Sequence, residues 1–121
     1  EGLHYLHMNG VAHRDLKCAN ILVRTKDGIV TSLHISDFGI SRVMVPEEGA
    51  ANVLASTVLG TPSFMAPEVL RSQKYDAFKA DIWSFGIMMY EMLSFSDNPV
   101  PGKKPAFADD VLEFLHQDGR F

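Results

Sequence analysis

The feature that most constrains the fold of this chain is an apolar run at residues 81–95. Ten of the 15 positions are apolar, so a helix built on this run has almost no polar face and needs protein around it. At 15 residues the run is shorter than the roughly 20 that a membrane span requires. We therefore expect a helix buried on all sides within a folded domain. Its apolar residues are Ile82, Trp83, Phe85, Ile87, Met88, Met89, Tyr90, Met92, Leu93 and Phe95.

Composition supports a folded domain and argues against several classes of partner. The chain has 121 residues, of which 46% are hydrophobic and 21% charged, which is typical of a globular protein. The net charge is −4 with no basic run, so we expect neither nucleic-acid binding nor a membrane span in this segment. Cys18 has no second cysteine to pair with, which favours an intracellular, cytoplasmic location. The start Glu1-Gly2-Leu3 resembles no natural N-terminus and predicts a fragment.

Local patterns predict a few elements around the apolar run. Helical spacing from Leu3 ends at Asn9-Gly10, as at a helix C-terminus. Residues 21–23 and 29–35 are predicted strands of a hairpin, because the Asp-Gly pair between them suits a tight turn. Residues 41–63 lack a sustained period and predict a long loop. An apolar stripe of Phe107, Val111, Phe114 and Leu115 predicts an amphipathic helix.

Four short motifs occur in a fixed order along the chain. Any one of them could arise by chance, but all four in this order within 121 residues could not. On these motifs the sequence resembles the protein kinase family along its whole length. The motifs are His13-Arg14-Asp15 with Asn20, Asp37-Phe38-Gly39, Ala66-Pro67-Glu68 and Asp81-Ile82-Trp83-Ser84-Phe85-Gly86.

The resemblance implies a fold and a domain organisation. The expected fold is mainly α with short β-hairpins, corresponding to the C-terminal lobe of the α+β protein-kinase fold. Residues 1–121 are expected to form a partial kinase domain with the catalytic loop, the activation segment and the following helices, without the N-terminal lobe and the C-terminal end. The expected activity is transfer of the γ-phosphate of ATP to a serine or threonine of a protein substrate. The chain alone is expected to be inactive, and the alternative is a pseudokinase or truncated kinase that acts as a binding or scaffold module.

The resemblance also implies roles for individual residues. Asp15 would accept or orient the proton of the substrate hydroxyl, Lys17 would stabilise charge on the γ-phosphate, and Thr61 would hydrogen-bond to both. These three are the predicted catalytic residues. Asp15 on its own would more often be a solvated surface residue, but the surrounding motifs favour the catalytic role.

Cofactor binding is expected from neighbouring positions. The amide oxygen of Asn20 and the carboxylate of Asp37 are hard oxygen ligands and are predicted to bind Mg²⁺. Leu22 is predicted to lie under the adenine of ATP, and Lys17 belongs to the nucleotide site as well. Met88 and Met92 match either a family spine or plain core packing.

The residues around the motifs favour a serine/threonine substrate. Lys17 follows Asp15 by two positions, and Ser63 stands where tyrosine kinases usually carry proline. The segments 13–23 and 35–42 look most like the tyrosine-kinase-like group of serine/threonine kinases, which includes mixed-lineage and Roco-type kinases.

Regulation is predicted from Arg14, which precedes Asp15 directly. In the family such an arginine often pairs with a phosphorylated residue of the activation segment, here residues 37–68. Ser56 and Thr57 are the candidate phosphorylation sites, and the alternative is a loop that is merely polar.

Three further features have a structural interpretation. His13 and Phe38 are expected to stack in a hydrophobic spine, so His13 would not act as a base. His4 and His7 stand three residues apart, but without a third ligand we expect surface or capping roles. Cys18 is expected to pack as an inert thiol, with redox sensitivity as the alternative.

Overall fold

The computed structural model describes residues 1–45, 54–71 and 74–94. The predicted amphipathic helix around Phe107, and the end of the apolar run at Phe95, lie outside the described residues. The helices are α1 (Gly2–Met8), α2 (Pro67–Leu70) and α3 (Ala77–Ser94), with 3-10 turns at Cys18–Asn20 and Pro62–Phe64. The strands are β1 (Val11–Ala12), β2 (Ile21–Lys26), β3 (Ile29–Ile35) and β4 (Arg42–Val43).

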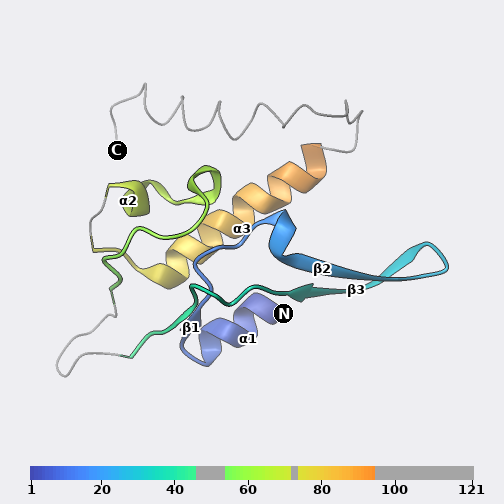
Figure 1. The fold of residues 1–121 in the computed structure, drawn as a ribbon, viewed down its shortest axis with the longest axis horizontal. Coiled ribbons are helices and arrows are strands. Elements are labelled where there is room, and N and C mark those ends of the chain that lie inside the picture. The colour runs from blue at the N-terminus through green and yellow to red at the C-terminus, as the bar shows by residue number, and fades with distance from the viewer. Residues whose placement is uncertain (46–53, 72–73, 95–121) are drawn as a thin grey trace.

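Strands β2 and β3 form the hairpin that the sequence predicts. Asp27 and Gly28 both have positive φ angles, 53° and 77°, which is the backbone a two-residue hairpin turn needs. The strands pair antiparallel from Ile21 opposite Ile35 to Lys26 opposite Ile29, with one irregularity beside Arg24. Figure 1 shows the hairpin extending away from the helices.

A second, smaller sheet brings two distant segments together. Strand β1 pairs antiparallel with β4, with Val11 opposite Val43. Between α1 and β1, Gly10 takes a φ of 71° that only glycine adopts cheaply, and the chain turns sharply there. The backbone N–H of Met44 donates to the Gly10 carbonyl at 2.7 Å, which extends the pairing. The segment after Asp37 is thereby fixed beside the segment before His13.

The described core lies where the first turns of α3 meet α2 and the β1–β4 sheet. It consists of small residues and a few large ones, and Met65, Phe78 and Trp83 pack against it. Its buried members are Ala12, Met44, Ala55, Ala66, Val69, Tyr75, Ala77 and Ala80.

Helix α3 corrects the expectation of a helix buried on all sides. It begins at Ala77, four residues before the apolar run, because Asp76 accepts hydrogen bonds from the backbone N–H groups of Phe78 and Lys79, as an N-cap does. Its buried residues are Ala77, Ala80, Asp81 and Met88, whereas Ile82 is 56% exposed and Leu93 69% exposed.

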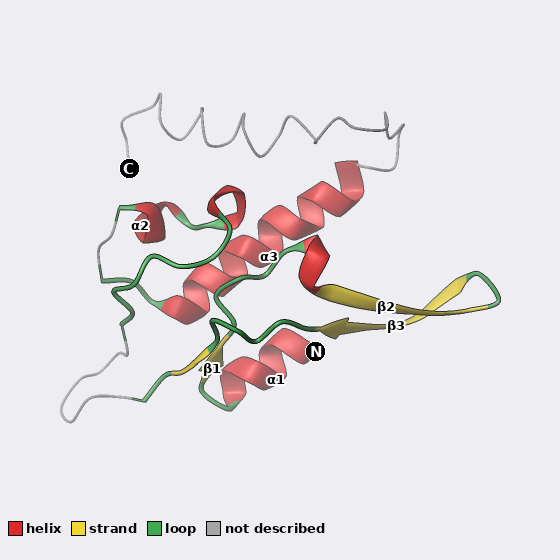
Figure 2. Cartoon of the chain, in the orientation of Figure 1, coloured by secondary structure: helices red, strands yellow, loops and turns green. Residues whose placement is uncertain are grey.

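The expected fold class is also contradicted. Four short strands are interspersed with the helices, and α3 is the one long helix among residues 1–45, 54–71 and 74–94 (Figure 2). We therefore describe the chain as a mixed arrangement of short strands and few helices, and the assignment to a mainly α, C-terminal lobe is not retained. That assignment rested on the family resemblance of the motifs, which does not itself fix the arrangement of helices and strands.

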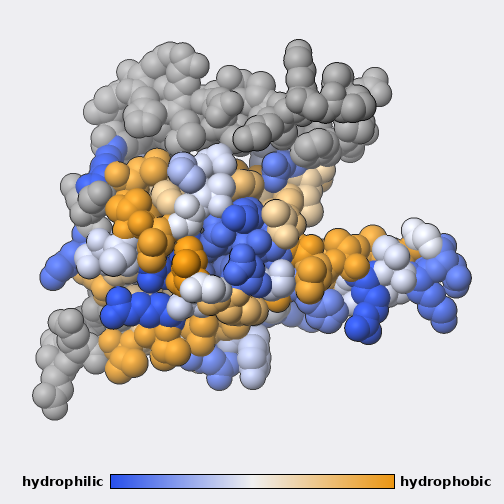
Figure 3. Space-filling model, in the orientation of Figure 1, coloured by the Kyte–Doolittle hydropathy of each residue, from blue (hydrophilic) through white to orange (hydrophobic). Residues whose placement is uncertain are grey.

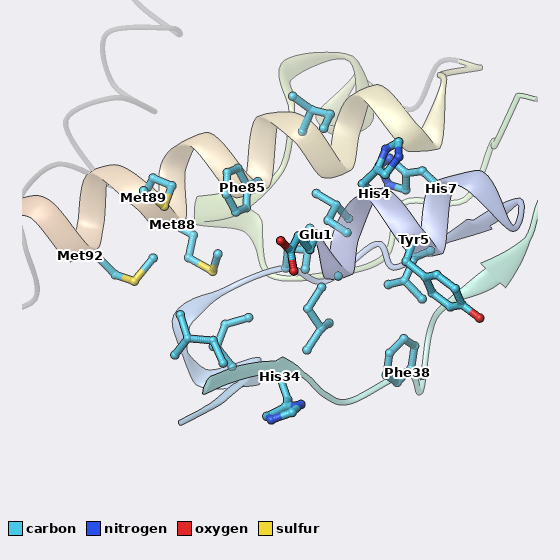
Figure 4. A pocket seen from close by; sticks show the side chains of 18 residues that line it. Glu1, His4, Tyr5, His7, His34, Phe38, Phe85, Met88, Met89 and Met92 are labelled. Carbon is cyan, nitrogen blue, oxygen red and sulfur yellow. The ribbon is translucent and has the colours of Figure 1, made fainter. Parts of the chain in front are cut away.

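An apolar groove of about 800 Å³ lies between α1, the base of the hairpin and α3. Figure 4 shows Phe85, Met88, Met89 and Met92 lining it from α3, with Phe38 on the opposite side. In Figure 3 the hydrophobic colour continues onto the base of the hairpin, whose tip is hydrophilic. Within the described part of the chain, no helix has the length and apolar character needed to cross a membrane.

Candidate active site

Asp15 lies in the loop 13–20, between β1 and β2, and is surrounded by hydrogen-bond donors. Lys17 Nζ donates to Asp15 Oδ2 at 2.7 Å, and Thr61 Oγ1 donates to Asp15 Oδ1 at 2.8 Å. Asn20 Nδ2 donates to the same Oδ2 at 3.2 Å and to the Asp15 backbone carbonyl at 2.8 Å. Lys17 also donates to Thr61 Oγ1 at 2.8 Å, so the predicted catalytic residues form one connected network.

This network sets the charge state of Asp15. Partial burial raises the pKa of its carboxyl, but hydrogen bonds from Lys17, Thr61 and Asn20 and the positive charge of Lys17 together outweigh that effect. The pKa of Asp15 therefore lies below its ordinary value, and the carboxylate is ionised at neutral pH. A carboxylate has about four acceptor positions, and of the hydrogen bonds between described residues Oδ1 accepts only that of Thr61. Oδ1 can accept one more donor.

Gly60 lets the Thr61 segment approach the loop closely. Its φ is 118°, and a Cβ at this position would lie 2.6 Å from the Arg14 carbonyl oxygen. A side chain here would push Thr61 away from Asp15, so glycine is required by both backbone angle and space.

The loop 13–20 is anchored from beneath by Asp81, at the start of the motif in α3. The Asp81 side chain is 1% exposed and accepts hydrogen bonds from the backbone N–H of His13 at 2.8 Å and of Arg14 at 2.7 Å. His7 Nε2 donates to the same carboxylate at 2.9 Å. Arg14 has a φ of 72°, which is uncommon for a residue with a side chain, and the bond to Asp81 holds it there.

His13 has a structural role in this arrangement. It is fully buried, and its Nε2 donates to the Ser36 carbonyl at 2.9 Å, because a carbonyl oxygen can only accept. Nδ1 then accepts from the backbone N–H of Asp15 at 3.3 Å. The ring also contacts Phe38 edge-on, with centroids 5.1 Å apart. Both ring nitrogens are thus engaged, as expected of a residue that does not act as a base.

Asn20 and Asp37 supply oxygen atoms suited to a magnesium ion. Asn20 uses its Nδ2 for Asp15, which leaves its amide oxygen available. Asp37 has a φ of 59°, and within the described chain its carboxylate accepts only a long 3.3 Å bond from the Gly39 backbone N–H. No three His, Cys, Asp or Glu side chains gather into a metal-binding group in residues 1–45, 54–71 and 74–94. The residues present fit Mg²⁺, which usually binds through one or two protein oxygens together with phosphates and water.

Leu22, the predicted adenine contact, is 60% exposed on β2. Of the two methionines predicted to belong to a family spine or to the core, Met88 is buried and Met92 is exposed. The apolar groove contains both methionines but neither Asp15, Asn20 nor Asp37 in its lining. The groove is therefore distinct from the network around Asp15.

Of the two candidate phosphorylation sites, the structure places Thr57 beside Arg14. Arg14 Nη2 donates to Thr57 Oγ1 at 2.7 Å and to the Thr57 carbonyl at 3.3 Å. Arg14 Nε is buried and has no hydrogen-bond partner among the described residues. Ser56 is exposed.

Cys18 is a protonated thiol. Burial is the main reason that its pKa rises to about 12, and the neighbouring Glu91 carboxylate adds to the effect. Its Sγ lies 3.9 Å from the Met88 carbonyl.

Sequence reasoning missed two contributors to the site. His7 was expected in a surface or capping role, and its bond to Asp81, 74 residues away, was not anticipated. Tyr75 was not singled out, yet its hydroxyl donates to the Thr57 carbonyl at 2.8 Å. Neither contact has a local signature, although the position of Asp81 in a motif was a signal that its carboxylate has a specific partner.

Comparison with known proteins identifies the family. The protein kinase domain model matches residues 1–116, and the chain therefore belongs to the protein kinase domain family. The match runs through almost the whole chain and, together with the strand content, gives no support to the C-terminal-lobe assignment.

Three relatives are named as serine/threonine or dual-specificity kinases. The chain is 40% identical over 119 residues to serine/threonine-protein kinase Nek6 of Oryza sativa subsp. japonica, covering 98% of this chain and 19% of that protein. It is 38% identical to serine/threonine-protein kinase ATG1a of Arabidopsis thaliana, covering 95% of this chain and 16% of that protein. It is 46% identical to dual specificity testis-specific protein kinase 1 of Rattus norvegicus, covering 78% of this chain and 15% of that protein. The chain thus spans less than a fifth of each of these relatives.

Proposed function

We propose that this chain provides part of the catalytic site of an ATP-dependent serine/threonine protein kinase. The observation that carries the proposal is the carboxylate of Asp15, held ionised by Lys17, Thr61 and Asn20 with an acceptor position left on Oδ1. Phosphoryl transfer to a hydroxyl depends on positioning and on neutralising charge, and this network supplies groups for both.

In the proposed mechanism, Asp15 Oδ1 accepts a hydrogen bond from the hydroxyl of the protein substrate and orients it for attack. Lys17, already hydrogen-bonded to Asp15 and Thr61, contributes a positive charge beside the transferred phosphoryl group. Thr61 is hydrogen-bonded to both Asp15 and Lys17 and so fixes the distance between their side chains.

Magnesium and ATP complete the proposed site. Asn20, through its amide oxygen, and Asp37, through its carboxylate, would hold Mg²⁺, which neutralises phosphate charge when bound. Leu22 is the proposed apolar contact for the adenine, in keeping with its exposure on β2.

The substrate residue is proposed to be serine or threonine. Lys17 and Ser63 favour this assignment, and so do the names of the relatives Nek6 and ATG1a, both serine/threonine-protein kinases. Membership of the tyrosine-kinase-like group, a partial kinase domain over residues 1–121 and an intracellular location remain hypotheses supported by sequence pattern alone.

Arg14 and Thr57 are proposed to form a regulatory pair. Phosphorylation of Thr57 would add about two negative charges and three acceptor oxygens next to a guanidinium. The buried, unpartnered Nε of Arg14 supports this, because a phosphate oxygen is an acceptor that it lacks among the described residues.

The test is Asp15→Asn in the natural protein that carries this chain, with phosphotransfer from Mg-ATP measured on a generic protein substrate. We expect kcat to fall by at least about a hundredfold with nucleotide affinity little changed, because Asn cannot accept the hydroxyl proton. Undiminished turnover in Asp15→Asn contradicts the mechanism. An inactive wild-type protein that still binds nucleotide or a protein partner supports the binding-module alternative, and phosphotyrosine as the sole product contradicts the substrate assignment.

A further inference from the structure

Tyr75 stands at the junction between the activation segment and α3. Its backbone N–H donates to the Ala55 carbonyl at 2.9 Å, and the Ala55 N–H donates back to the Tyr75 carbonyl at 2.7 Å. Its side chain is 4% exposed and belongs to the core beside Ala66 and Ala77. A residue whose backbone and ring are both fixed presents its hydroxyl at a defined position.

That hydroxyl reaches Thr57. It donates to the Thr57 carbonyl at 2.8 Å, while Arg14 Nη2 approaches the same carbonyl at 3.3 Å and the Thr57 Oγ1 at 2.7 Å. The backbone of Thr57 is therefore bound by Tyr75, and its side-chain oxygen is directed to Arg14. Without the Tyr75 hydroxyl, the hydrogen bonds that hold Thr57 within the described part of the chain come from Arg14 alone.

We propose that Tyr75 is a positioning residue, whose hydroxyl fixes the backbone of Thr57 so that the phosphorylated side chain meets the guanidinium of Arg14. The inference rests on the proposed function, because it assumes phosphorylation of Thr57. That reaction forms a bond between Oγ1 and the γ-phosphorus of ATP, and it releases ADP and the hydroxyl proton. The Tyr75 hydroxyl takes no part in the transfer and acts only through the place that it gives to Thr57.

Phenylalanine could not replace Tyr75 in this role, because the hydroxyl of Tyr75 makes the hydrogen bond to Thr57. Phenylalanine at position 75 keeps the packing against Ala66 and Ala77 and the backbone pairing with Ala55, but it loses the bond to Thr57. A purely structural role for Tyr75 rests on the packing and pairing, and Tyr75→Phe leaves both intact. The substitution therefore separates the two roles.

The first measurement is amide hydrogen exchange of residues 54–61 in the natural protein, comparing wild type, Tyr75→Phe and the control Tyr5→Phe. Tyr5 is 69% exposed on α1 and lies outside the proposed catalytic network. We expect exchange in this segment to rise about fivefold in Tyr75→Phe, the factor that corresponds to one hydrogen bond of ordinary strength. Exchange in α3 and in Tyr5→Phe should match wild type. Equal exchange of residues 54–61 in all three proteins overturns the proposal.

The second measurement is the ratio of kinase activity with and without phosphate on Thr57. We expect Tyr75→Phe to reduce this ratio several-fold and Tyr5→Phe to leave it unchanged, whereas a structural defect would lower both activities alike. If Tyr75→Phe leaves the ratio at the wild-type value, the positioning role is overturned while the proposed kinase function stands. If Thr57→Ala has wild-type activity, the regulatory pair fails and the inference with it, and the Asp15→Asn test remains as the independent check on catalysis.

Discussion

Asp81→Asn is the substitution that most directly tests how the site is built. The Asp81 carboxylate accepts three hydrogen bonds, from the backbone of His13 and of Arg14 and from His7 Nε2. Asparagine has the same shape but only one acceptor oxygen, so its NH₂ group must face at least one of these donors. The loop 13–20 then loses an anchor without any loss of volume.

The free-energy cost of Asp81→Asn follows from the loss and weakening of these three hydrogen bonds. One buried N–H left unsatisfied costs about 1–3 kcal/mol, and the remaining bonds weaken from charged to neutral, by about 1 kcal/mol. The sum is about 2–4 kcal/mol. At 1.4 kcal/mol per factor of ten, opening of the loop becomes roughly 30 to 1,000 times more frequent. Arg14, whose φ of 72° depends on this anchor, should be affected most.

The assay is amide exchange of the peptide that covers residues 11–17, together with phosphotransfer activity, in the natural protein. Asp76→Asn is the matched control, because Asp76 also accepts two backbone N–H bonds but caps a helix, where Asn and Asp are equally good. Exchange should rise by one to three orders of magnitude in Asp81→Asn and stay near wild type in Asp76→Asn. Equal behaviour of the two variants would refute the idea that Asp81 holds the loop.

Three further predictions follow from the same structure. Gly60→Ala should lower activity at least tenfold, because the new Cβ would lie 2.6 Å from the Arg14 carbonyl oxygen. Gly86→Ala is the control, because a Cβ at this position in α3 meets no other atom of the described residues within 4 Å. It should be tolerated and should raise the free energy of unfolding by about 0.5–1 kcal/mol in thermal unfolding. The Cys18 thiol, whose pKa is raised to about 12, should react with iodoacetamide far more slowly at pH 8 than an unperturbed cysteine does. Its alkylation rate should rise about tenfold per pH unit as long as the pH is below this pKa. Rapid labelling of Cys18 at pH 8 would contradict the raised pKa. Residues 1–121 expressed alone should self-associate through the exposed apolar face of α3 and lack kinase activity. A monomer in sedimentation with a sharp melting transition in calorimetry would contradict the expected self-association.

Local chemistry was predictable from the sequence, and long-range contacts were not. The hairpin followed from Asp27-Gly28, and the end of α1 from Asn9-Gly10, because turns and caps are decided by neighbouring residues. The predicted start of α3 is too late, because the apolar run begins after Ala80 whereas the cap at Asp76 starts the helix at Ala77. The bond from Tyr75 to Thr57 depends on how separate segments pack, which no local pattern records.

The backbone of the site gives an argument for function that is independent of motifs. Positive φ angles in the described chain fall mostly on glycine or in the hairpin turn, where glycine and aspartate adopt them at little cost. Arg14 and Asp37 lie outside those places. Aspartate adopts a positive φ more readily than most residues, but for arginine the conformation costs about 1–2 kcal/mol. Glycine at position 14 would remove that cost, yet it would also remove the guanidinium that contacts Thr57. The chain therefore keeps at position 14 a side chain that is unfavourable for the backbone, and because this is the side chain proposed to bind phosphate, the strain at Arg14 is explained by the chemistry of the site.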